Sequence, residues 1–287
     1  MGERGRDITV VIANSEDESV FNCIDSANGG AKIVVSLTPY APIEARLSRL
    51  NIPFVVVPRG NLSITYNSGI ELATTNKVII MDSDTVFTPR AIEQLGHGLE
   101  QYDACKARLS FQYDDTQTLS GIVANARDFI NSSPTRAYTP GLALRKDIRN
   151  QMGGYFFNEQ IRWAVDSEFS YRFHKNGLQF GYIPDAVVNH PAVSIRHDLT
   201  EAFLMGLSKR RAVDLGVREG NEDVLPTLKR ILSGETFAKR GKLFKEKGVS
   251  TLLYMLTWDL LYNFGYNLRK LGLSGSTEER IWRGFGR

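Results

Sequence analysis

The chain has 287 residues, of which 42% are hydrophobic and 23% are charged, and its formal net charge at pH 7 is +3. These values are those of an ordinary folded protein with a substantial core, and they exclude a largely disordered chain. The charge is uneven, because residues 229–287 hold 12 Lys/Arg and 5 Asp/Glu, a net +7, which leaves −4 for everything before them.

The first eighty residues alternate between strands and helices. Strands are predicted at 8–12, 31–37, 53–57 and 77–81, with a helix start after 13–17 and helices at about 42–50 and 62–74. This alternation is typical of an α/β fold with a mostly parallel central sheet, right-handed crossovers and flanking helices.

The following part of the chain is less regular than the first. Helices are predicted at about 89–102, 119–130 and 166–175, and strands at 104–111, 137–144, 178–182 and 186–189. We therefore expect a catalytic domain over residues 1–195 and a helical, basic C-terminal region over residues 196–287.

The C-terminal region contains predicted helices at 198–215 and 250–271, joined through a linker near 217–223. Leucines recur at helical spacing in the second helix, but Asp259 and Asn263 interrupt its apolar character, so a membrane-spanning helix is not predicted. An amphipathic helix beside a basic run fits an anionic membrane interface, and it fits equally a helix packed on the catalytic domain or in a homodimer. Nucleic acid is disfavoured as a partner because no recognised binding motif is present.

Cys23 and Cys105 are the only cysteines, and both lie in apolar contexts without metal-binding or redox spacing. We expect two buried, unreactive thiols in a reducing compartment. The first residues lack the apolar segment of a secretory signal, and Arg6 stands where myristoylation requires Ser or Thr. The expected location is the cytoplasm, or the cytoplasmic face of a membrane as a peripheral protein.

Two carboxylates end the apolar run at 77–81. Side chains alternate along an extended segment, so Asp82 and Asp84 should point the same way and Ser83 the other way. Paired acids at the tip of a buried parallel strand suit a divalent cation that also binds diphosphate oxygens. An ordinary turn after the strand is the alternative, because Asp and Ser are common turn residues.

The order of motifs over roughly residues 7–192 resembles the family 2 glycosyltransferases of the GT-A fold. The resemblance is carried by Ile8–Ile12, Asn67-Ser68-Gly69-Ile70, Asp82-Ser83-Asp84, Gly153-Gly154-Tyr155 to Glu159, Val165-Asp166 with Arg172 and Gly177, and Ile183-Pro184-Asp185-Ala186-Val187-Val188-Asn189-His190. It implies a Rossmann-like catalytic domain that transfers a sugar, with inversion, from a nucleotide-diphosphate sugar to an acceptor hydroxyl.

The resemblance also implies roles for single residues. Asp84 would bind the cation, Asp82 the ribose or the cation, and His190 would complete the metal or diphosphate contacts. A mixed oxygen and imidazole set favours Mn²⁺ over Mg²⁺. The donor site would further include Ala13, Asn14, Glu16, Ser36, Asn67 and Ser83. A UDP sugar is the favoured donor, and the acceptor is a glycan or a lipid-linked saccharide.

Asp166 is implied to be the general base, because it follows the glycine-rich loop of the acceptor site. A plain helix N-terminus explains Asp166 without any catalytic role, since acids there offset the helix dipole. Gly154, Glu159 and Trp163 are candidate acceptor contacts, although core packing explains an aromatic residue as well. His190 could likewise be a half-buried histidine at a strand end, and Asn67 could merely shape its helix.

Several positions depart from the family pattern. Ala13-Asn14-Ser15-Glu16 replaces the usual Pro-Thr-Tyr-Asn, and Ser36-Leu37 stands where an aspartate commonly reads the base. Tyr66 replaces a frequent arginine, and Val165 replaces the first acid of the Glu-Asp pair. A nucleotidyltransferase is one alternative function, because it could use a similar sheet and similar acids. A non-catalytic sugar-binding or membrane-binding scaffold is another, because the base-reading aspartate is missing and the C-terminal region is basic.

Overall fold

The computed structural model describes residues 7–27, 31–113, 118–131, 133–191, 193–219 and 234–270. The chain forms two compact units, one of residues 1–110 and 131–191 and the other of residues 111–130 and 192–287. The longer part of the second unit starts at residue 192, close to the expected boundary at 195. The unit also includes residues 111–130, which were expected in the first domain. Most of the predicted linker at 217–223, and the basic stretches 220–233 and 271–287, lie outside the described residues.

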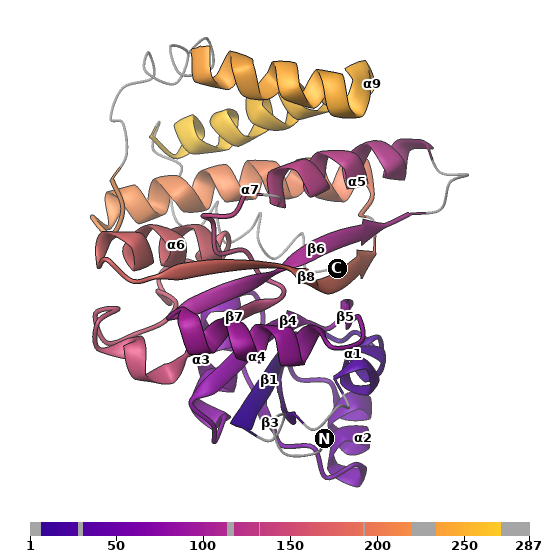
Figure 1. The fold of residues 1–287 in the computed structure, drawn as a ribbon, viewed down its shortest axis with the longest axis vertical. Helices are drawn as coiled ribbons and strands as arrows, with labels where there is room; N and C mark the ends of the chain where they lie inside the picture. Colours follow the sequence, from indigo (N-terminus) through magenta and orange to yellow (C-terminus); the bar gives the residue numbers. More distant parts are fainter. Residues whose placement is uncertain are drawn as a thin grey trace. The chain divides into compact units, whose positions relative to one another are not determined.

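The first unit is built on a mixed sheet (Figure 1). Within the described residues its eight strands lie in the order β3-β2-β1-β4-β7-β6-β8-β5. The strands are β1 (Ile8–Asn14), β2 (Lys32–Leu37), β3 (Phe54–Val56), β4 (Lys77–Asp82), β5 (Val86–Phe87), β6 (Ala104–Gln112), β7 (Leu142–Arg145) and β8 (Phe180–Pro191). Strands β3, β2, β1 and β4 are parallel, whereas β7 is antiparallel to β4 and β6, and β5 is antiparallel to β8. The predicted parallel sheet is therefore confirmed in the half that carries the acids.

Both faces of the parallel half are covered by helices. The helices of this unit are α1 (Val20–Ser26), α2 (Ala41–Arg49), α3 (Leu62–Leu72), α4 (Ala91–Gln101) and α6 (Val165–Lys175). A Cβ on Gly69 of α3 would meet Val11 at 2.2 Å, and one on Gly96 of α4 would meet Ile8 at 2.7 Å. Val11 and Ile8 lie three residues apart on one strand, so α3 and α4 pack on opposite faces of the sheet.

Burial on both faces explains why β4 reads as a continuous apolar run. Val78, Ile79, Ile80 and Met81 are all fully buried, as expected for a central parallel strand. The predicted break between strands 178–182 and 186–189 is wrong, because β8 runs through Pro184 without interruption. Its partner β5 pairs only with Val188 and Asn189, so the missing N–H of the proline costs no hydrogen bond to β5.

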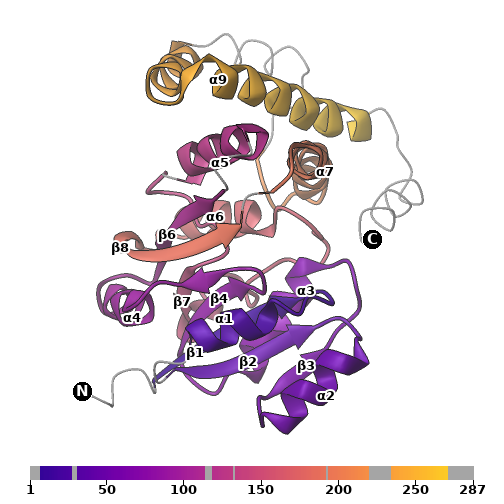
Figure 2. The same cartoon turned by 90° about the vertical axis from the view of Figure 1, so that its right-hand side faces the viewer.

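The described part of the second unit is mainly α-helical (Figure 2). Its helices are α5 (Thr118–Asn131, up to residue 130), α7 (Ile195–Asp214) and α9 (Gly234–Lys270), the last with a break at Gly248. Val123 and Ala126 of α5 form an apolar cluster with Tyr254 of α9. Among the described residues, no helix is both long enough and apolar enough to cross a membrane.

Two glycines bring α7 and α9 into close contact. A Cβ on Gly206 would lie 2.0 Å from the carbonyl oxygen of Tyr262, and one on Gly265 would lie 2.1 Å from that of Phe203. The contact is reciprocal, because the backbone of each helix packs directly against a glycine of the other. The predicted C-terminal helix therefore packs on a helix of its own unit.

Candidate functional site

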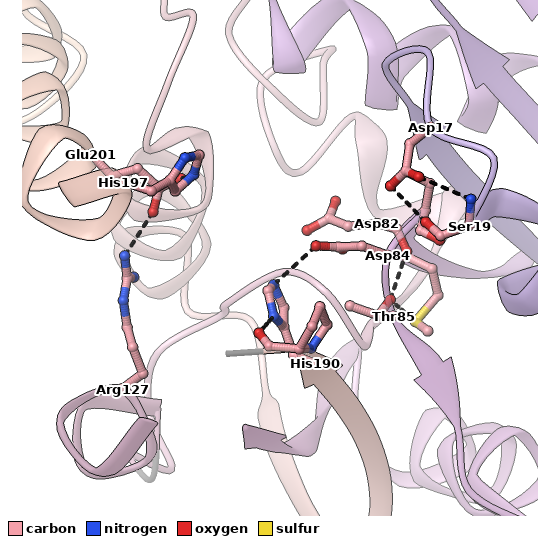
Figure 3. A network of polar contacts seen from close by, with 12 residues as sticks. Asp17, Ser19, Asp82, Asp84, Thr85, Arg127, His190, His197 and Glu201 are labelled. Carbon is pink, nitrogen blue, oxygen red and sulfur yellow. Dashed lines mark hydrogen bonds and ion pairs between the residues drawn. The ribbon is translucent and has the colours of Figure 1, made fainter. Parts of the chain in front are cut away.

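The acids at the end of β4 are held by a tight turn. The backbone N–H of Ser83 donates to the carbonyl of Ala13 at 3.0 Å, and the Thr85 hydroxyl donates to the carbonyl of Asp82 at 2.6 Å. Ser83 and Thr85 are buried. The side chains of Asp82 and Asp84 project to the same side of the strand end (Figure 3), as expected, although Ser83 and Asp84 form a turn and not an extended segment.

His190 lies beside Asp84 because β5 pairs with the end of β8. The Val86–Asn189 pairing sets this register, and the Nε2 atom of His190 lies 3.8 Å from Oδ2 of Asp84 (Figure 3). Its Nδ1 atom lies 2.6 Å from the carbonyl oxygen of Pro191. A hydrogen bond to that carbonyl needs a proton on Nδ1, which leaves the lone pair of the neutral ring on Nε2, toward Asp84.

This arrangement fits a divalent cation that is shared with a substrate. A carboxylate oxygen and an imidazole nitrogen that face each other are suitable ligands for Mn²⁺. Among the described residues, no group of three or more His, Cys, Asp or Glu side chains is arranged to hold a metal.

A loop after β1 supports the turn between the two acids. The Ser19 hydroxyl lies 2.9 Å from the carbonyl oxygen of Ser83 and 2.6 Å from Oδ2 of Asp17. The backbone N–H of Asp17 donates to Oδ1 of Asn14 at 3.0 Å. Asp17 and Ser19 were not among the predicted site residues, although an asparagine side chain such as that of Asn14 often binds a backbone N–H a few residues away.

Three buried polar atoms at the carboxyl ends of β1 and β2 have no hydrogen-bond partner within the described parts of the chain. They are Nδ2 of Asn14, Oγ of Ser36 and Oγ1 of Thr38, in side chains that are at most 4% exposed. The strands are adjacent, because Ala13 pairs with Ser36 and the N–H of Thr38 donates to the carbonyl of Asn14. Buried polar atoms are normally paired, so this edge of the sheet offers unused donors and acceptors to a ligand.

The other residues predicted after β1 have structural contacts of their own. Ala13 is buried and accepts the Ser83 hydrogen bond through its backbone. Glu16 has a left-handed backbone (φ 60°) and forms an ion pair with Arg59.

Tyr66 contacts the first acid from α3. This side chain is 1% exposed, and its hydroxyl donates to Oδ1 of Asp82 at 2.8 Å. Burial, followed by the charge of Asp82, raises the pKa of the Tyr66 phenol, and the charge of Asp166 adds to the shift. The carboxylates of Asp82 and Asp166 therefore both influence this one buried group.

Asn67 ties α3 to the segment after the two glycines. Its Nδ2 donates to the carbonyl of Phe157 at 2.8 Å and to Oε1 of Glu159 at 3.1 Å, and its Oδ1 accepts from the N–H of Phe157 at 3.1 Å. The structure thus places Asn67 and Glu159 in one network, which fixes the segment 153–159. Gly154 and Glu159 are exposed, and Trp163 is half-buried.

Asp166 lies in the first turn of α6. Ala164, at the N-cap, has a left-handed backbone (φ 50°), and Asp166 is half-buried. One turn later Phe169 is fully buried and stacks on Phe157, with ring centroids 5.3 Å apart. The segment 153–159 and the helix that carries Asp166 are therefore packed together.

The helix α6 is further fixed by a buried ion pair. Arg172 donates to Oε1 of Glu168 at 2.7 Å and to the carbonyl of Tyr155 at 2.9 Å. The motif arginine therefore has a structural role, in which it holds the loop that precedes Asp166.

Both cysteines are buried and free, as expected. Burial, followed by the charges of Asp82 and Asp84, raises the pKa of the Cys23 thiol, and burial raises that of Cys105 to about 12. Neither thiol is a nucleophile near neutral pH.

Comparisons with known proteins give a likeness in structure. No family model matches the sequence, and no curated protein matches it. The crystal structure of S. aureus TarS is 11% identical with a TM-score of 0.50, over 91% of this chain and 55% of that chain. Residues 1–349 of TarS give 11% identity and a TM-score of 0.51, over 94% of this chain and 93% of that chain.

A third solved structure, GalNAc-T7 with UDP, GalNAc and Mn²⁺, is 11% identical with a TM-score of 0.49, over 64% of this chain and 43% of that chain. The present chain spans about half of the full TarS structure. TarS is a GT-A-type glycosyltransferase, and the likeness, at this low identity, concerns the fold. The fold of this chain is therefore the GT-A fold, an α/β sheet flanked by helices with a helical C-terminal part.

Proposed function

We propose that the protein is a metal-dependent inverting glycosyltransferase. The observation that carries the proposal is the group at the end of β4, where Asp82 and Asp84 project together and Nε2 of His190 lies 3.8 Å from Asp84. Open α/β sheets bind their ligands beyond the carboxyl ends of the strands, and these residues occupy that position. A GT-A fold with this group is suited to a nucleotide-diphosphate sugar.

The donor would lie along the carboxyl ends of β1, β2 and β4. The unpartnered atoms of Asn14, Ser36 and Thr38 are neutral donors and acceptors, and they suit the polar edge of a nucleobase or the ribose hydroxyls. UDP is the first nucleotide to test. Asp84 and His190 would hold a divalent cation, Mn²⁺ before Mg²⁺, which offsets the charge that grows on the departing diphosphate.

The chemical step needs a base on the acceptor side. In our proposal Asp166 takes the proton from the acceptor hydroxyl as that oxygen bonds to the anomeric carbon. The bond between the anomeric carbon and the diphosphate oxygen breaks, and its electron pair leaves with the nucleoside diphosphate. Attack opposite to the departing group inverts the anomeric configuration. Gly154, Glu159 and Trp163 would contact the acceptor, a glycan or lipid-linked saccharide.

The test is a binding and product assay. Wild-type protein is screened by thermal shift with nucleotide sugars, with and without Mn²⁺, because a ligand of the native state raises the melting temperature. We expect a shift that needs both components and that Asp84→Asn abolishes. The control Glu93→Gln changes an exposed surface acid, ion-paired to Arg90, in the first turn of α4.

The products separate the alternatives. Released nucleoside diphosphate supports sugar transfer, whereas released pyrophosphate would identify a nucleotidyltransferase. Binding of a sugar or a membrane without any nucleotide binding would identify a non-catalytic scaffold.

We further propose that α9 binds an anionic membrane surface as a peripheral element. Leu253, Leu260 and Phe264 are 59%, 66% and 57% exposed and lie at helical spacing, whereas Tyr254 and Tyr266, on the packed side, are buried. Residues 234–270 hold seven Lys/Arg and three Asp/Glu. Apolar side chains on a basic helix suit acidic headgroups.

Vesicle co-sedimentation tests this surface. The full chain should pellet with phosphatidylserine-rich vesicles more than with phosphatidylcholine vesicles. Serine at positions 253, 260 and 264 should remove that difference, whereas Leu50→Ser, a change of a 52% exposed leucine in the first unit, should not. Equal pelleting of all variants contradicts the proposal. A wild-type homodimer that the triple variant converts to monomer would assign the surface to a second copy instead.

A further inference from the structure

Tyr66, which stands where the family often has an arginine, makes specific contacts beside the acids. Its ring is buried in α3, and its hydroxyl reaches two groups, Oδ1 of Asp82 at 2.8 Å and Oγ1 of Thr139 at 3.3 Å. A carboxylate is only an acceptor and a phenol has one proton, so the Tyr66 proton belongs to the bond with Asp82. The Thr139 hydroxyl can then donate to the phenol oxygen.

This hydrogen bond fixes the plane of one carboxylate of the site. Asp82 is the last residue of β4, and its backbone is held by β1 and by the turn through Thr85. The terminal torsion of an aspartate has a broad energy minimum, and a hydrogen bond to Oδ1 narrows it. With Oδ1 held by a buried donor, the carboxylate meets the donor substrate in one orientation.

The ring of Tyr66 also belongs to the packing that supports the acceptor side. Its centroid lies 5.2 Å from that of Phe157, and Phe157 stacks on Phe169 of α6 at 5.3 Å. Phe169 is one helical turn after Asp166. A continuous series of contacts therefore joins Asp82, through one buried side chain, to the helix that carries the proposed base.

We infer that Tyr66 is a positioning residue with two separable parts. Its hydroxyl orients Asp82 for the donor and cation, and its ring holds the segment 153–159, which would contact the acceptor, against α6. This inference rests on the proposed function. The hydroxyl and the ring can be removed one at a time, by Tyr66→Phe and by Tyr66→Leu, so each part has its own test.

Tyr66→Phe keeps the ring and removes one hydrogen bond to a charged group. We expect the Kd for Mn²⁺ in the presence of UDP, measured by calorimetry, and the KM for the donor to rise about tenfold. The KM for the acceptor should stay unchanged. Tyr66→Leu should raise the acceptor KM as well. Tyr102→Phe is the control, because this half-buried ring packs on Gly181 and its hydroxyl takes part in no hydrogen bond among the described residues.

A double-mutant cycle separates positioning from a general loss of stability. If Tyr66 acts through Asp82, then Tyr66→Phe should weaken Mn²⁺ binding in the wild-type background but have no further effect in Asp82→Ala, which lacks the acceptor of the hydrogen bond. Equal effects in both backgrounds, or wild-type Mn²⁺ affinity with only a lower melting temperature, would overturn the inference. Wild-type protein that binds neither Mn²⁺ nor UDP would overturn the proposed function, and the inference with it.

Discussion

Asp84 and His190 meet through a two-residue strand. Without the pairing of β5 with the end of β8, the imidazole would have no fixed position relative to the acids. The Nδ1 contact with Pro191 then sets the ring orientation. Such supporting hydrogen bonds are as much part of a metal site as its ligands.

His190→Gln tests the choice of metal. An amide oxygen replaces the imidazole nitrogen, so we expect Mn²⁺ affinity to fall by roughly tenfold while Mg²⁺ affinity changes less. Calorimetry with each ion in the presence of UDP measures both. His97→Gln is the matched control, because His97 is exposed on α4. Equal losses for the two ions would remove His190 from the proposed ligands.

Asp166→Asn tests the proposed base. The amide keeps the shape of the side chain but does not accept the proton, so kcat should fall by roughly 10²- to 10⁴-fold. Donor binding, measured by calorimetry, should stay at the wild-type value. A variant that turns over at the wild-type rate would leave Asp166 with a helix-terminal role alone.

Among the single residues of the candidate site, some positions were predictable from the sequence and others were not. Asp82 and Asp84 were expected to point the same way, and they do (Figure 3), but Asp84 lies in the turn after β4 and not in an extended segment. The contacts of Ser19 and Tyr66 were not predictable from a local pattern, because Ser19 binds the Ser83 carbonyl and Tyr66 binds Asp82 from other elements of the fold. The donor role of Asn67 stays a prediction; its amide contacts the Phe157 backbone, a contact that no local pattern encodes.

At the level of the elements, α7 and α9 cross so closely that Gly206 has no room for a side chain. Gly206→Ala places a methyl group against the Tyr262 carbonyl, so we expect it to destabilise the protein by about 1–3 kcal/mol. Chemical denaturation measures the change. Gly241→Ala is the control, since nothing lies within 4 Å of its Cβ position, and alanine there should stabilise the helix by roughly 0.5–1 kcal/mol. A neutral Gly206→Ala would show that the helices separate easily.

A polar network on α5, α7 and α9 makes the stability of the second unit depend on pH. Asp198 is fully buried and bonds Arg127 and Tyr254, and Arg127 also pairs with Glu201 at 2.7 Å. The hydrogen bond to Glu201 raises the pKa of His197, although burial opposes it. Burial raises the pKa of Glu201, but His197 and Arg127 outweigh it, so that pKa is lowered.

The directions of these two pKa shifts define the pH range over which the network stabilises the fold. A raised histidine pKa stabilises the fold fully below the unfolded value of about 6.5, and this contribution is lost as pH rises through the folded value. A lowered glutamate pKa stabilises above about 4.3, and this contribution is lost as pH falls through the folded value. We expect His197→Gln to flatten the decline in melting temperature above pH 6.5. An unchanged profile would contradict the pairing.

Element positions were largely predictable, because periodicity and turn residues report local structure. The strand at 137–144 was predicted too long, since only β7 (Leu142–Arg145) pairs with β4 and β6. The antiparallel order of the later strands was not predictable, because it depends on contacts between distant segments.

For the whole molecule, the discontinuous second unit decides how the chain can be divided. A chain that ends at Gly216 would lack α9, and Asp198 and the α5 cluster would lose Tyr254. We expect such a truncated protein to bind the dye ANS and to lose cooperative unfolding of α7, as measured by near-ultraviolet circular dichroism. A compact, cooperative product would show that α5 and α7 are stable without α9. Point variants on the exposed side of α9 are therefore the better test of membrane binding.

The same discontinuity sets a delay during synthesis. Val123 leaves the ribosome about 130 residues before Tyr254, the residue that completes its cluster. At roughly 5–20 residues per second, the apolar face of α5 waits on the order of ten seconds for its partner. A nascent chain of this protein therefore exposes, for some seconds, apolar side chains that the finished molecule buries.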